Sequence, residues 1–272
     1  MLSGNNPKVK YLRRLGDRRF REREGKFVVE GTRFVEEALA SAFPVEMLAY
    51  SEPDEANQRR RAVLAKAAAR GVACLEIEPR LFKELADTVT PQGVLAVVER
   101  RWTRLSDLRP KAAAWLLVLA DGVQDPGNLG GILRSADAAN ADGLILLKGT
   151  ADIYNPKALR ATMGSIFHLP VFQNVALEEV KEFFKQQQIK LIAGTPGQGQ
   201  ALYHCDLTVS CALLAGSEAA GPQTETRAAA AEQAQIPMPG QAESLNVAVS
   251  TGIMLYEAIR QRARGVSREP SP

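Results

Sequence analysis

The sequence has little of the material that several enzyme classes need. Only two histidines, His168 and His204, occur in 272 residues, so a histidine-dependent catalytic triad or a multi-histidine metal site is not favoured, and we expect no metal. The three cysteines, Cys74, Cys205 and Cys211, are odd in number and lack the paired spacing of metal ligands. Reduced thiols are the simplest explanation, and they predict a cytoplasmic protein.

Long apolar runs are also absent. No stretch of eighteen or more apolar residues exists, which predicts no membrane span, and the first residues lack the apolar core of a signal peptide. Residues 194–199 are rich in glycine but have neither the spacing nor the lysine of a phosphate-binding P-loop. The sequence contains 46% hydrophobic and 24% charged residues, a composition typical of a globular protein. Its length of 272 residues is sufficient for two domains.

Positive charge is concentrated near the N-terminus. Between residues 8 and 26, nine Lys and Arg side chains stand against three acidic ones, although the whole chain has a net charge of only +3. Arginine dominates this segment, and its guanidinium group can bind phosphate through two hydrogen bonds. A solvated helix face is one explanation. The local excess of positive charge favours nucleic acid over other partners.

The first part of the chain alternates between strand and helix patterns. Four strands are expected, at residues 27–31, 45–50, 72–77 and 93–99. One helix is expected at residues 33–40, with Thr32 placed to cap it. A second helix, basic and rich in alanine, is expected after the strand at residues 45–50 and ends at about residue 70. This order predicts a mostly parallel or mixed sheet with helices packed on it. The polar residues 100–111 are expected to form a linker.

A second alternating pattern follows the expected linker. Its strands are expected at residues 115–120, 144–147, 189–193 and 212–214. Its helices are expected at residues 129–140, 156–166, 177–187 and 247–264. The alanine-rich residues 224–235 are expected to form a helix or a mobile loop.

Three segments of this second part follow strands, and ligands of open α/β sheets bind beyond the carboxyl ends of strands. In the first segment Asn128 is placed to cap a helix, Gly130 permits close backbone approach, and Arg134 projects on the same helix face. The second segment is a glycine-bounded turn that carries Glu218. Taken singly, these segments can also be an ordinary capped helix with a surface arginine and an ordinary turn.

The third segment, residues 236–252, is a stiff loop that enters a helix. Two prolines and two glycines fix its path, and Ser244 and Asn246 present hydrogen-bonding side chains where it ends. The apolar side chains of Ile236, Met238 and Leu245 can surround exposed backbone groups or simply pack in a core. Core packing does not explain why the loop itself is so restricted, so a ligand-binding loop is favoured.

In this order the three segments resemble the motifs of the SpoU (TrmH-like) RNA 2′-O-ribose methyltransferases of the SPOUT superfamily. Residues 128–137 (NLGGILRSAD) resemble the first motif of the family, and residues 214–218 (LAGSE) resemble the second. Residues 236–240 (IPMPG), which lead to residues 244–247 (SLNV), resemble the third. Residues 27–31 (FVVEG), followed by Arg33, are similar to the substrate-binding domain of many members. The chain departs from the family at Ala219, where glycine is usual.

The resemblance implies a fold, a cofactor and an assembly. The expected α/β fold has an N-terminal ribosomal-protein-like substrate-binding domain at residues 1–104 and a C-terminal trefoil-knotted SPOUT methyltransferase domain at residues 113–266. The implied methyl donor is S-adenosyl-L-methionine (AdoMet). The implied partners are RNA and a second copy of the chain, which forms a homodimer through the catalytic domain.

The resemblance also implies roles for individual residues. The catalytic cluster is expected to comprise Asn128, Arg134, Glu218, Ser244 and Asn246. The cofactor is expected to contact Gly194, Gly216, Ile236, Met238 and Leu245. RNA phosphates are expected to contact Arg13, Arg14, Arg18, Arg19 and Arg33. Because a guanidinium group is not an ordinary base, Arg134 is interpreted as an electrostatic clamp on the RNA that Ser244 and Asn246 orient.

The expected product is a 2′-O-methyl ribose, and large-subunit (23S) ribosomal RNA is the favoured substrate. Members of the family that act on transfer RNA often lack the N-terminal domain and carry a basic C-terminal extension, whereas the tail after Arg264 is short here. Two alternatives stay open: a transfer-RNA 2′-O-ribose methyltransferase, and a non-catalytic RNA-binding protein of the same fold.

Overall fold

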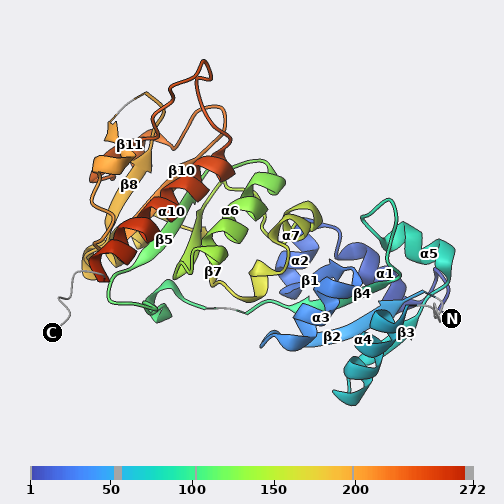
Figure 1. The fold of residues 1–272 in the computed structure, drawn as a ribbon. Helices are drawn as coiled ribbons and strands as arrows, with labels where there is room; N and C mark the ends of the chain where they lie inside the picture. The colour runs from blue at the N-terminus through green and yellow to red at the C-terminus, as the bar shows by residue number, and fades with distance from the viewer. Residues whose placement is uncertain (1, 52–56, 102, 198, 267–272) are drawn as a thin grey trace. The chain divides into compact units, whose positions relative to one another are not determined.

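The computed structural model describes residues 2–51, 57–101, 103–197 and 199–266, which fold as two compact units (Figure 1). Unit 1 comprises Met1–Trp102 together with Tyr154–Phe167, and unit 2 comprises Thr103–Ile153 together with His168–Pro272. Both units are α/β, as predicted.

Unit 1 contains a four-stranded mixed sheet. In chain order its elements are α1 (Pro7–Arg14), α2 (Arg18–Glu24), β1 (Lys26–Glu30), α3 (Thr32–Ala40), β2 (Val45–Tyr50), α4 (Gln58–Ala69), β3 (Ala73–Glu76), α5 (Pro79–Leu85) and β4 (Val94–Glu99), followed much later by α7 (Pro156–Thr162) and η2 (Ser165–Phe167). The strand order is β1-β4-β2-β3, in which only β2 and β3 run parallel. The sequence pattern predicted all four strands.

Aromatic side chains fill part of the core of unit 1. The ring of Phe27, on β1, lies 4.8 Å from that of Tyr154 and 6.4 Å from that of Phe167, measured between centroids. Phe34 and Phe43 also pack edge-on against Phe167, at 5.5 and 5.3 Å. Chain segments more than a hundred residues apart therefore share one apolar cluster.

The start of α3 differs from the prediction that Thr32 caps it. Gly31 is the capping residue, with a φ of 104° that favours glycine, and Thr32 is the first helical residue. The backbone N–H of Thr32 donates to Oε1 of Gln92 at 2.8 Å. A glutamine distant in sequence thus replaces the expected local cap, which the local pattern could not indicate.

Unit 2 contains a seven-stranded sheet. In chain order its elements are η1 (Leu105–Asp107), β5 (Leu116–Asp121), α6 (Pro126–Ala138), β6 (Gly143–Leu147), β7 (Val171–Val175), α8 (Leu177–Gln186), β8 (Lys190–Gly194), β9 (Gln200–Ala201), η3 (Leu202–His204), β10 (Cys211–Gly216), α9 (Thr224–Ala228), β11 (Glu232–Gln235) and α10 (Val247–Val266). The strand order is β7-β6-β5-β10-β8-β11-β9, and all of its pairs are parallel. Because parallel strands are buried on both faces, β5, β6 and β10 consist almost entirely of buried apolar residues.

Helices cover the sheet of unit 2. Phe183 and Phe184 of α8 belong to a core cluster with Leu117, Leu119 and Leu214 of the strands. Helices α6 and α10 lie side by side along the sheet (Figure 1). Small residues permit their close approach, since a Cβ added to Gly131 would lie 3.2 Å from the Cβ of Ala248. The start of α10 is thereby held next to α6.

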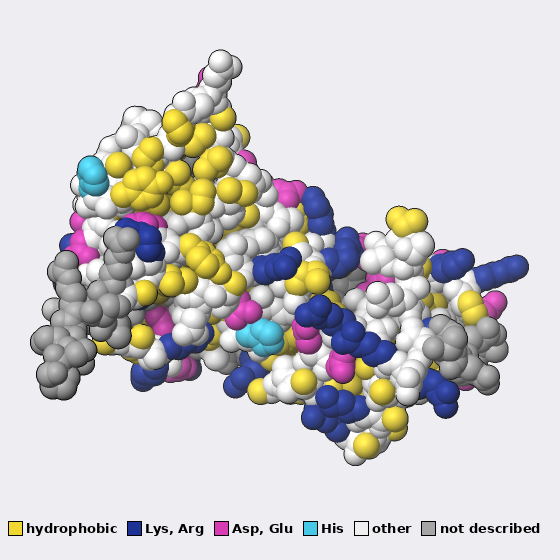
Figure 2. All heavy atoms as spheres, in the orientation of Figure 1, with side chains coloured by type: hydrophobic (Ala, Val, Ile, Leu, Met, Phe, Trp, Pro, Cys, Tyr) yellow, Lys and Arg dark blue, Asp and Glu magenta, His cyan; other side chains and the backbone are white. Residues whose placement is uncertain are grey.

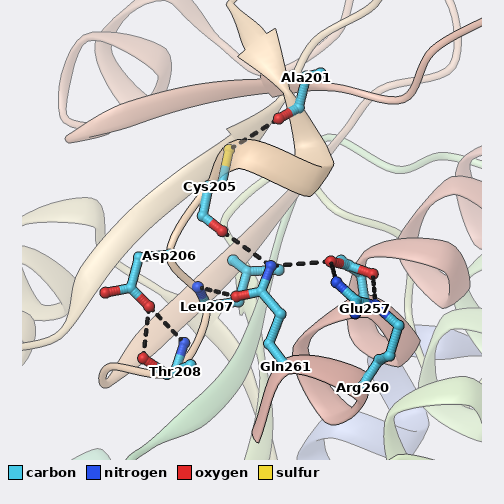
Figure 3. Close-up of polar contacts among 8 residues, drawn as sticks. All are labelled: Ala201, Cys205, Asp206, Leu207, Thr208, Glu257, Arg260 and Gln261. Carbon is cyan, nitrogen blue, oxygen red and sulfur yellow. Dashed lines mark hydrogen bonds and ion pairs between the residues drawn. The ribbon is translucent and has the colours of Figure 1, made fainter. Parts of the chain in front are cut away.

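The end of α10 is bound to the loop before β10 by polar groups (Figure 3). The side-chain amide of Gln261 donates to the carbonyl oxygen of Cys205 at 3.0 Å and to Glu257 at 2.9 Å, and its Oε1 accepts from the backbone N–H of Leu207 at 2.9 Å. The buried carboxylate of Glu257 also accepts two hydrogen bonds from Arg260, at 2.7 and 2.6 Å.

Arg262 adds a second set of contacts at the same end of α10. Its guanidinium group donates to four backbone carbonyl oxygens at 2.7–3.1 Å, those of Leu207, Ala114, Trp115 and Val209. One side chain therefore joins α10 to the start of β5 and to the loop before β10.

Two other elements of the second pattern differ from prediction. Residues 224–235 form the short helix α9 and then strand β11, which pairs with β8, rather than one helix or a loop. The helix expected at residues 156–166 ends at Thr162, because Met163 adopts a left-handed conformation with a φ of 49°. The sequence did not predict strand β7 or helices α1, α2 and α5, because these short elements lack a strong pattern of apolar residues.

Candidate functional site

The candidate site lies at the carboxyl ends of four neighbouring parallel strands, β5, β10, β8 and β11. The loop after β5 leads into α6 and carries Asn128, and the loop after β10 carries Glu218. The chain after β11 runs through residues 236–246 into α10. Since the strands are adjacent in the sheet, these separate segments meet at one edge, as the sequence predicts.

Asn128 does not cap α6, and that prediction is wrong. The helix begins one turn earlier, at Pro126, and its capping residue is Asp125, whose carboxylate accepts the backbone N–H of Asn128 at 2.9 Å. An acidic residue followed by proline is a favourable helix start, so the Asp125-Pro126 pair could have indicated this boundary. The Asn128 side chain is consequently available for contacts with other loops.

Asn128, Glu218 and Asn246 form a hydrogen-bonded chain that joins all three motifs. The amide nitrogen of Asn128 donates to Oε1 of Glu218 at 2.8 Å, and its carbonyl oxygen accepts from the amide of Asn246 at 2.8 Å. Glu218 also accepts from the backbone N–H groups of Gln124 and Asp125, at 3.3 and 3.4 Å. The carboxylate therefore fixes the loop before α6 as well as the side chain of Asn128.

These contacts determine the ionisation of Glu218. Partial burial by itself raises the pKa of its carboxyl group, but hydrogen bonds from Asn128 and from backbone N–H groups stabilise the charged form. The pKa of Glu218 is therefore lowered, and the group is a carboxylate at neutral pH. A permanent acceptor suits the orientation of neighbouring donors better than it suits acid catalysis.

Asn246 has a second contact that ties it to α10. Its Oδ1 accepts the backbone N–H groups of Ala248 and Val249, at 2.9 and 3.3 Å, so the residue caps the helix while its amide nitrogen contacts Asn128. Ser244, two residues earlier, is exposed.

Arg134 lies outside the hydrogen-bonded chain. It is exposed on α6, and among the described residues neither Arg134 nor Ser244 forms a side-chain hydrogen bond or ion pair. One turn further along the helix, Asp137 contacts Nδ1 of His168 at 3.1 Å. The structure thus joins Asn128, Glu218 and Asn246 and leaves Arg134 and Ser244 open to solvent.

The residues expected to contact a cofactor fit a ligand bound mainly through backbone groups. A Cβ at Gly194 would lie 2.8 Å from the sulfur of Met254, and one at Gly216 would lie 2.2 Å from the backbone nitrogen of Pro222. The strand end at Gly216 is therefore restricted to glycine, because its neighbour is backbone, whereas the flexible Met254 side chain beside Gly194 can move. Ile236 and Met238 are half-buried and Leu245 is 36% exposed, so apolar surface borders the same loops.

The arginines expected to bind RNA are all exposed on unit 1. Three form surface ion pairs, with Glu84, Glu22 and Glu37 at 2.9, 2.9 and 3.2 Å, and these are Arg13, Arg18 and Arg33. Arg14 lies 4.1 Å above the ring of Phe20, and Arg19 is exposed on α2. Exposed ion pairs contribute little stability and can exchange for phosphate at low cost.

Arg21, from the same basic segment, has a structural role that the charge pattern concealed. It is 3% exposed and donates to the carbonyl oxygens of Leu15 and Gly16, at 3.0 and 2.6 Å. It links the end of α1 to α2, so the excess of positive charge at the surface is smaller than the sequence suggests.

Other chemistry has little support in the part of the chain that the structure describes. There, no group of three or more His, Cys, Asp and Glu side chains is arranged to hold a metal, and no helix has the length and apolar character to cross a membrane. The cysteines are free, and burial raises the pKa of Cys211 to about 11, which keeps its thiol protonated.

Known proteins resemble this chain along nearly all of its length. Residues 115–256 match the SpoU rRNA Methylase family, and residues 6–96 match the MRM3-like substrate binding domain. The 23S rRNA (uridine(2479)-2′-O)-methyltransferase of Streptomyces viridochromogenes is 36% identical over 92% of this chain and 88% of its own length. The 23S rRNA (guanosine(2553)-2′-O)-methyltransferase RlmP of Bacillus subtilis is 34% identical over 93% of this chain and 96% of its own.

A solved structure extends the similarity to three dimensions. The SpoU methyltransferase AviRb from Streptomyces viridochromogenes, in complex with the cofactor AdoMet, superposes with a TM-score of 0.86 and 33% identity, and the match covers 96% of this chain and 100% of that one. The family predicted from the three motifs is confirmed, as is the α/β fold with an N-terminal substrate-binding domain. The chain belongs to the SpoU rRNA methylase family.

Proposed function

We propose that this protein is an AdoMet-dependent RNA methyltransferase that forms a 2′-O-methyl ribose in large-subunit (23S) ribosomal RNA. The observation that carries the proposal is the hydrogen-bonded series Glu218–Asn128–Asn246, which joins the three family motifs at one edge of the sheet. The two relatives are named for this reaction and this RNA, and the similar structure AviRb has been solved with AdoMet.

The chemistry divides between cofactor and protein. When bound, AdoMet supplies a methyl group already activated as a sulfonium. The protein has to bring the ribose hydroxyl into line and stabilise the negative charge that develops on its oxygen. Gly194, Gly216, Ile236, Met238 and Leu245 are proposed to hold the cofactor, because their strand ends and loops offer backbone groups beside apolar surface.

Arg134 is proposed as the residue that clamps the RNA phosphate and stabilises the developing alkoxide. It is exposed and has no ion-pair partner among the described residues, so its charge is available to an anionic substrate. Asn128 and Asn246 are proposed to orient the substrate side of the site, with Glu218 as the fixed acceptor between the loops. Ser244 lies beside Asn246 on the same loop and is proposed to contact the substrate.

A change of Arg134 to alanine tests this assignment. We expect methyl transfer to fall by at least about a hundredfold, the usual loss when a donor to a developing oxyanion is removed, while AdoMet affinity stays within about threefold. Arg134→Lys keeps the charge but not the two-point geometry and should retain an intermediate rate. Single-turnover transfer to ribosomal RNA and calorimetric AdoMet binding measure both quantities. Near-normal turnover by Arg134→Ala with AdoMet bound would contradict the role.

Two alternative functions make different predictions. A non-catalytic RNA-binding protein is disfavoured by the intact hydrogen-bonded series Glu218–Asn128–Asn246, and it would show no methyl transfer even with AdoMet bound. A transfer-RNA methyltransferase would modify transfer RNA but not ribosomal RNA. Mapping 2′-O-methyl sites in both RNAs from a strain that lacks the gene distinguishes the alternatives.

A homodimer through unit 2 and a knotted chain path are part of the proposal. Val249 and Tyr256 lie seven residues apart on α10, hence on one helix face, and are 52% and 55% exposed. Hydrophobic side chains gather on the face of unit 2 where α10 lies (Figure 2). Such a surface suits a second copy of the chain.

The free cysteines fit a reducing compartment, and we propose that the protein acts in the cytoplasm.

A further inference from the structure

Asp121 is the last residue of β5 and lies directly before the loop that leads into α6. Its side chain is fully buried, and within the described ranges its carboxylate accepts from Gln223 alone: Oδ2 from the backbone N–H at 2.7 Å and Oδ1 from the side-chain amide at 2.9 Å. Among the described residues Asp121 forms no ion pair. Loss of these two hydrogen bonds would leave a buried carboxylate without a partner, which is costly. The two hydrogen bonds therefore hold Gln223 in place.

Gln223 ends the loop that follows β10, and this loop is folded tightly back on itself. Ser217 and Gly221 exchange two backbone hydrogen bonds, at 3.0 and 2.9 Å. Pro222 is pressed against Gly216, where no Cβ could fit. Because Gly216 pairs with Asp121 across the sheet, the loop begins and ends beside the same carboxylate.

The tip of this loop is the part that enters the candidate site. Glu218 contacts Asn128 and the backbone before α6, as described above. The loop is therefore fastened at two places, at its base by Asp121 and at its tip by Asn128. If the base were released, Pro222 would lose its defined position against Gly216, and Glu218 would lose its position beside Asn128.

We infer that Asp121 is a positioning residue for methyl transfer: through Gln223 it holds the 216–223 loop in the conformation in which Gly216 presents its backbone to AdoMet and Glu218 orients Asn128. The inference rests on the proposed function, since it assigns Gly216 to the cofactor. The role assigned to Asp121 is indirect, because its side chain is fully buried and acts through Gln223.

A reversal of the donor and acceptor tests the inference. In Gln223→Glu two carboxylates face each other, so the side-chain contact is lost. In Asp121→Asn the new amide can still pair with Gln223, because the glutamine amide can turn and accept through its oxygen. In the double variant the amide introduced at position 121 can donate to the carboxylate introduced at position 223, while its oxygen still accepts the backbone N–H. Gln223 is exposed, so these changes add no bulk to the core at that position. Thr224→Glu, which adds the same charge at the next exposed residue, is the matched control.

Two measurements follow the loop and the cofactor separately. In the protein without AdoMet, we expect hydrogen exchange of the Ser217 and Gly221 amides to accelerate about tenfold in Gln223→Glu, to change less in Asp121→Asn, and to return close to the wild-type rate in the double variant. The AdoMet dissociation constant should rise about tenfold in Gln223→Glu and recover to within about threefold of the wild-type value in the double variant. Thr224→Glu should leave both quantities unchanged.

The outcomes separate this inference from the proposed function. Unchanged exchange in Gln223→Glu, or faster exchange with unchanged AdoMet affinity, would overturn the positioning role. Failure of the double variant to recover either quantity would also overturn it, because a merely destabilised fold is not repaired by a reversed hydrogen bond. If the wild-type protein bound no AdoMet, the proposed function would fail instead, and the exchange rates would still decide whether Asp121 holds the loop.

Discussion

At the scale of single residues, the site depends on acceptors whose charge is fixed by their neighbours. Glu218 is the clearest case, because hydrogen bonds from Gln124, Asp125 and Asn128 converge on it. Only a permanent carboxylate can accept them all. This requirement makes stability at this site depend on pH.

Glu218→Gln should make the protein less sensitive to acid. The folded pKa of Glu218 lies below its ordinary value of 4.5, so its contribution to stability is full above that value and is lost as the pH falls through the folded pKa. We expect wild type to be more stable than Glu218→Gln at pH 7 and the difference to shrink below about pH 4.5. Urea unfolding at several pH values measures it. A difference that stayed constant down to pH 3 would contradict the assignment.

The residues of the site show what a sequence can and cannot predict. Asn128, Glu218 and Asn246 follow strands or precede helices, so their meeting at one edge could be predicted from the strand order. The partner of each hydrogen bond could not, because these contacts join residues 90 and 118 positions apart. The contact between Asp121 and Gln223 could not be predicted for the same reason, because these residues are 102 positions apart.

At the scale of elements, strands with continuous apolar runs were predictable and short amphipathic pieces were not. Strands β5, β6 and β10 are buried on both sides, which produces an unmistakable run of apolar residues. Strand β11 (EQAQ) has only one buried residue, Ala234, and forms because β8 beside it offers a free edge. Tertiary pairing, rather than local preference, decides such a strand.

The attachment of α10 depends on Arg262, and its loss should destabilise unit 2. Arg262→Met removes the donor to four carbonyl oxygens, and we expect a loss of about 3 kcal/mol in the free energy of unfolding. Lys190→Met, which removes a surface ion pair with Glu232 in the same unit, should cost less than about 1 kcal/mol. Denaturant unfolding followed by tryptophan fluorescence and by circular dichroism compares them. Equal losses would show that Arg262 is an ordinary surface charge.

At the scale of the whole molecule, two proposals concern surfaces rather than single contacts. One is the apolar face of α10, and the other is the set of arginines on unit 1. Figure 2 shows Lys and Arg side chains spread widely over unit 1. The two surfaces are tested by different measurements.

An acidic side chain on α10 should separate the dimer. For Val249→Asp with Tyr256→Asp we expect a mass near the 29.5 kDa of one chain, because burial of two carboxylates in an apolar interface is unfavourable. Val89→Asp, at a fully exposed valine of unit 1, is the control and should remain dimeric. Light scattering after size exclusion gives the masses. A monomeric wild type would exclude the dimer.

Replacement of Arg13, Arg14 and Arg33 by alanine should weaken RNA binding more than methyl transfer at saturating RNA. If all three contact phosphates, the slope of log affinity against log salt should fall by about 2 to 3. The control removes the same charge from another exposed place, at Arg61, Lys66 and Arg70 on or after α4. Filter binding over a range of salt measures the slopes. Equal slopes for both triple variants would assign binding to net charge alone.

The aromatic cluster of unit 1 has a consequence for the order of events during synthesis. Phe27 emerges early from the ribosome, but Tyr154 and Phe167, which cover it, follow more than 120 residues later. The N-terminal unit cannot close its core as soon as its own strands exist, so it waits with an apolar face exposed while β5 and β6 are made. A nascent chain arrested just after β4 should therefore still need a chaperone, and one arrested once Phe167 has left the exit tunnel should not.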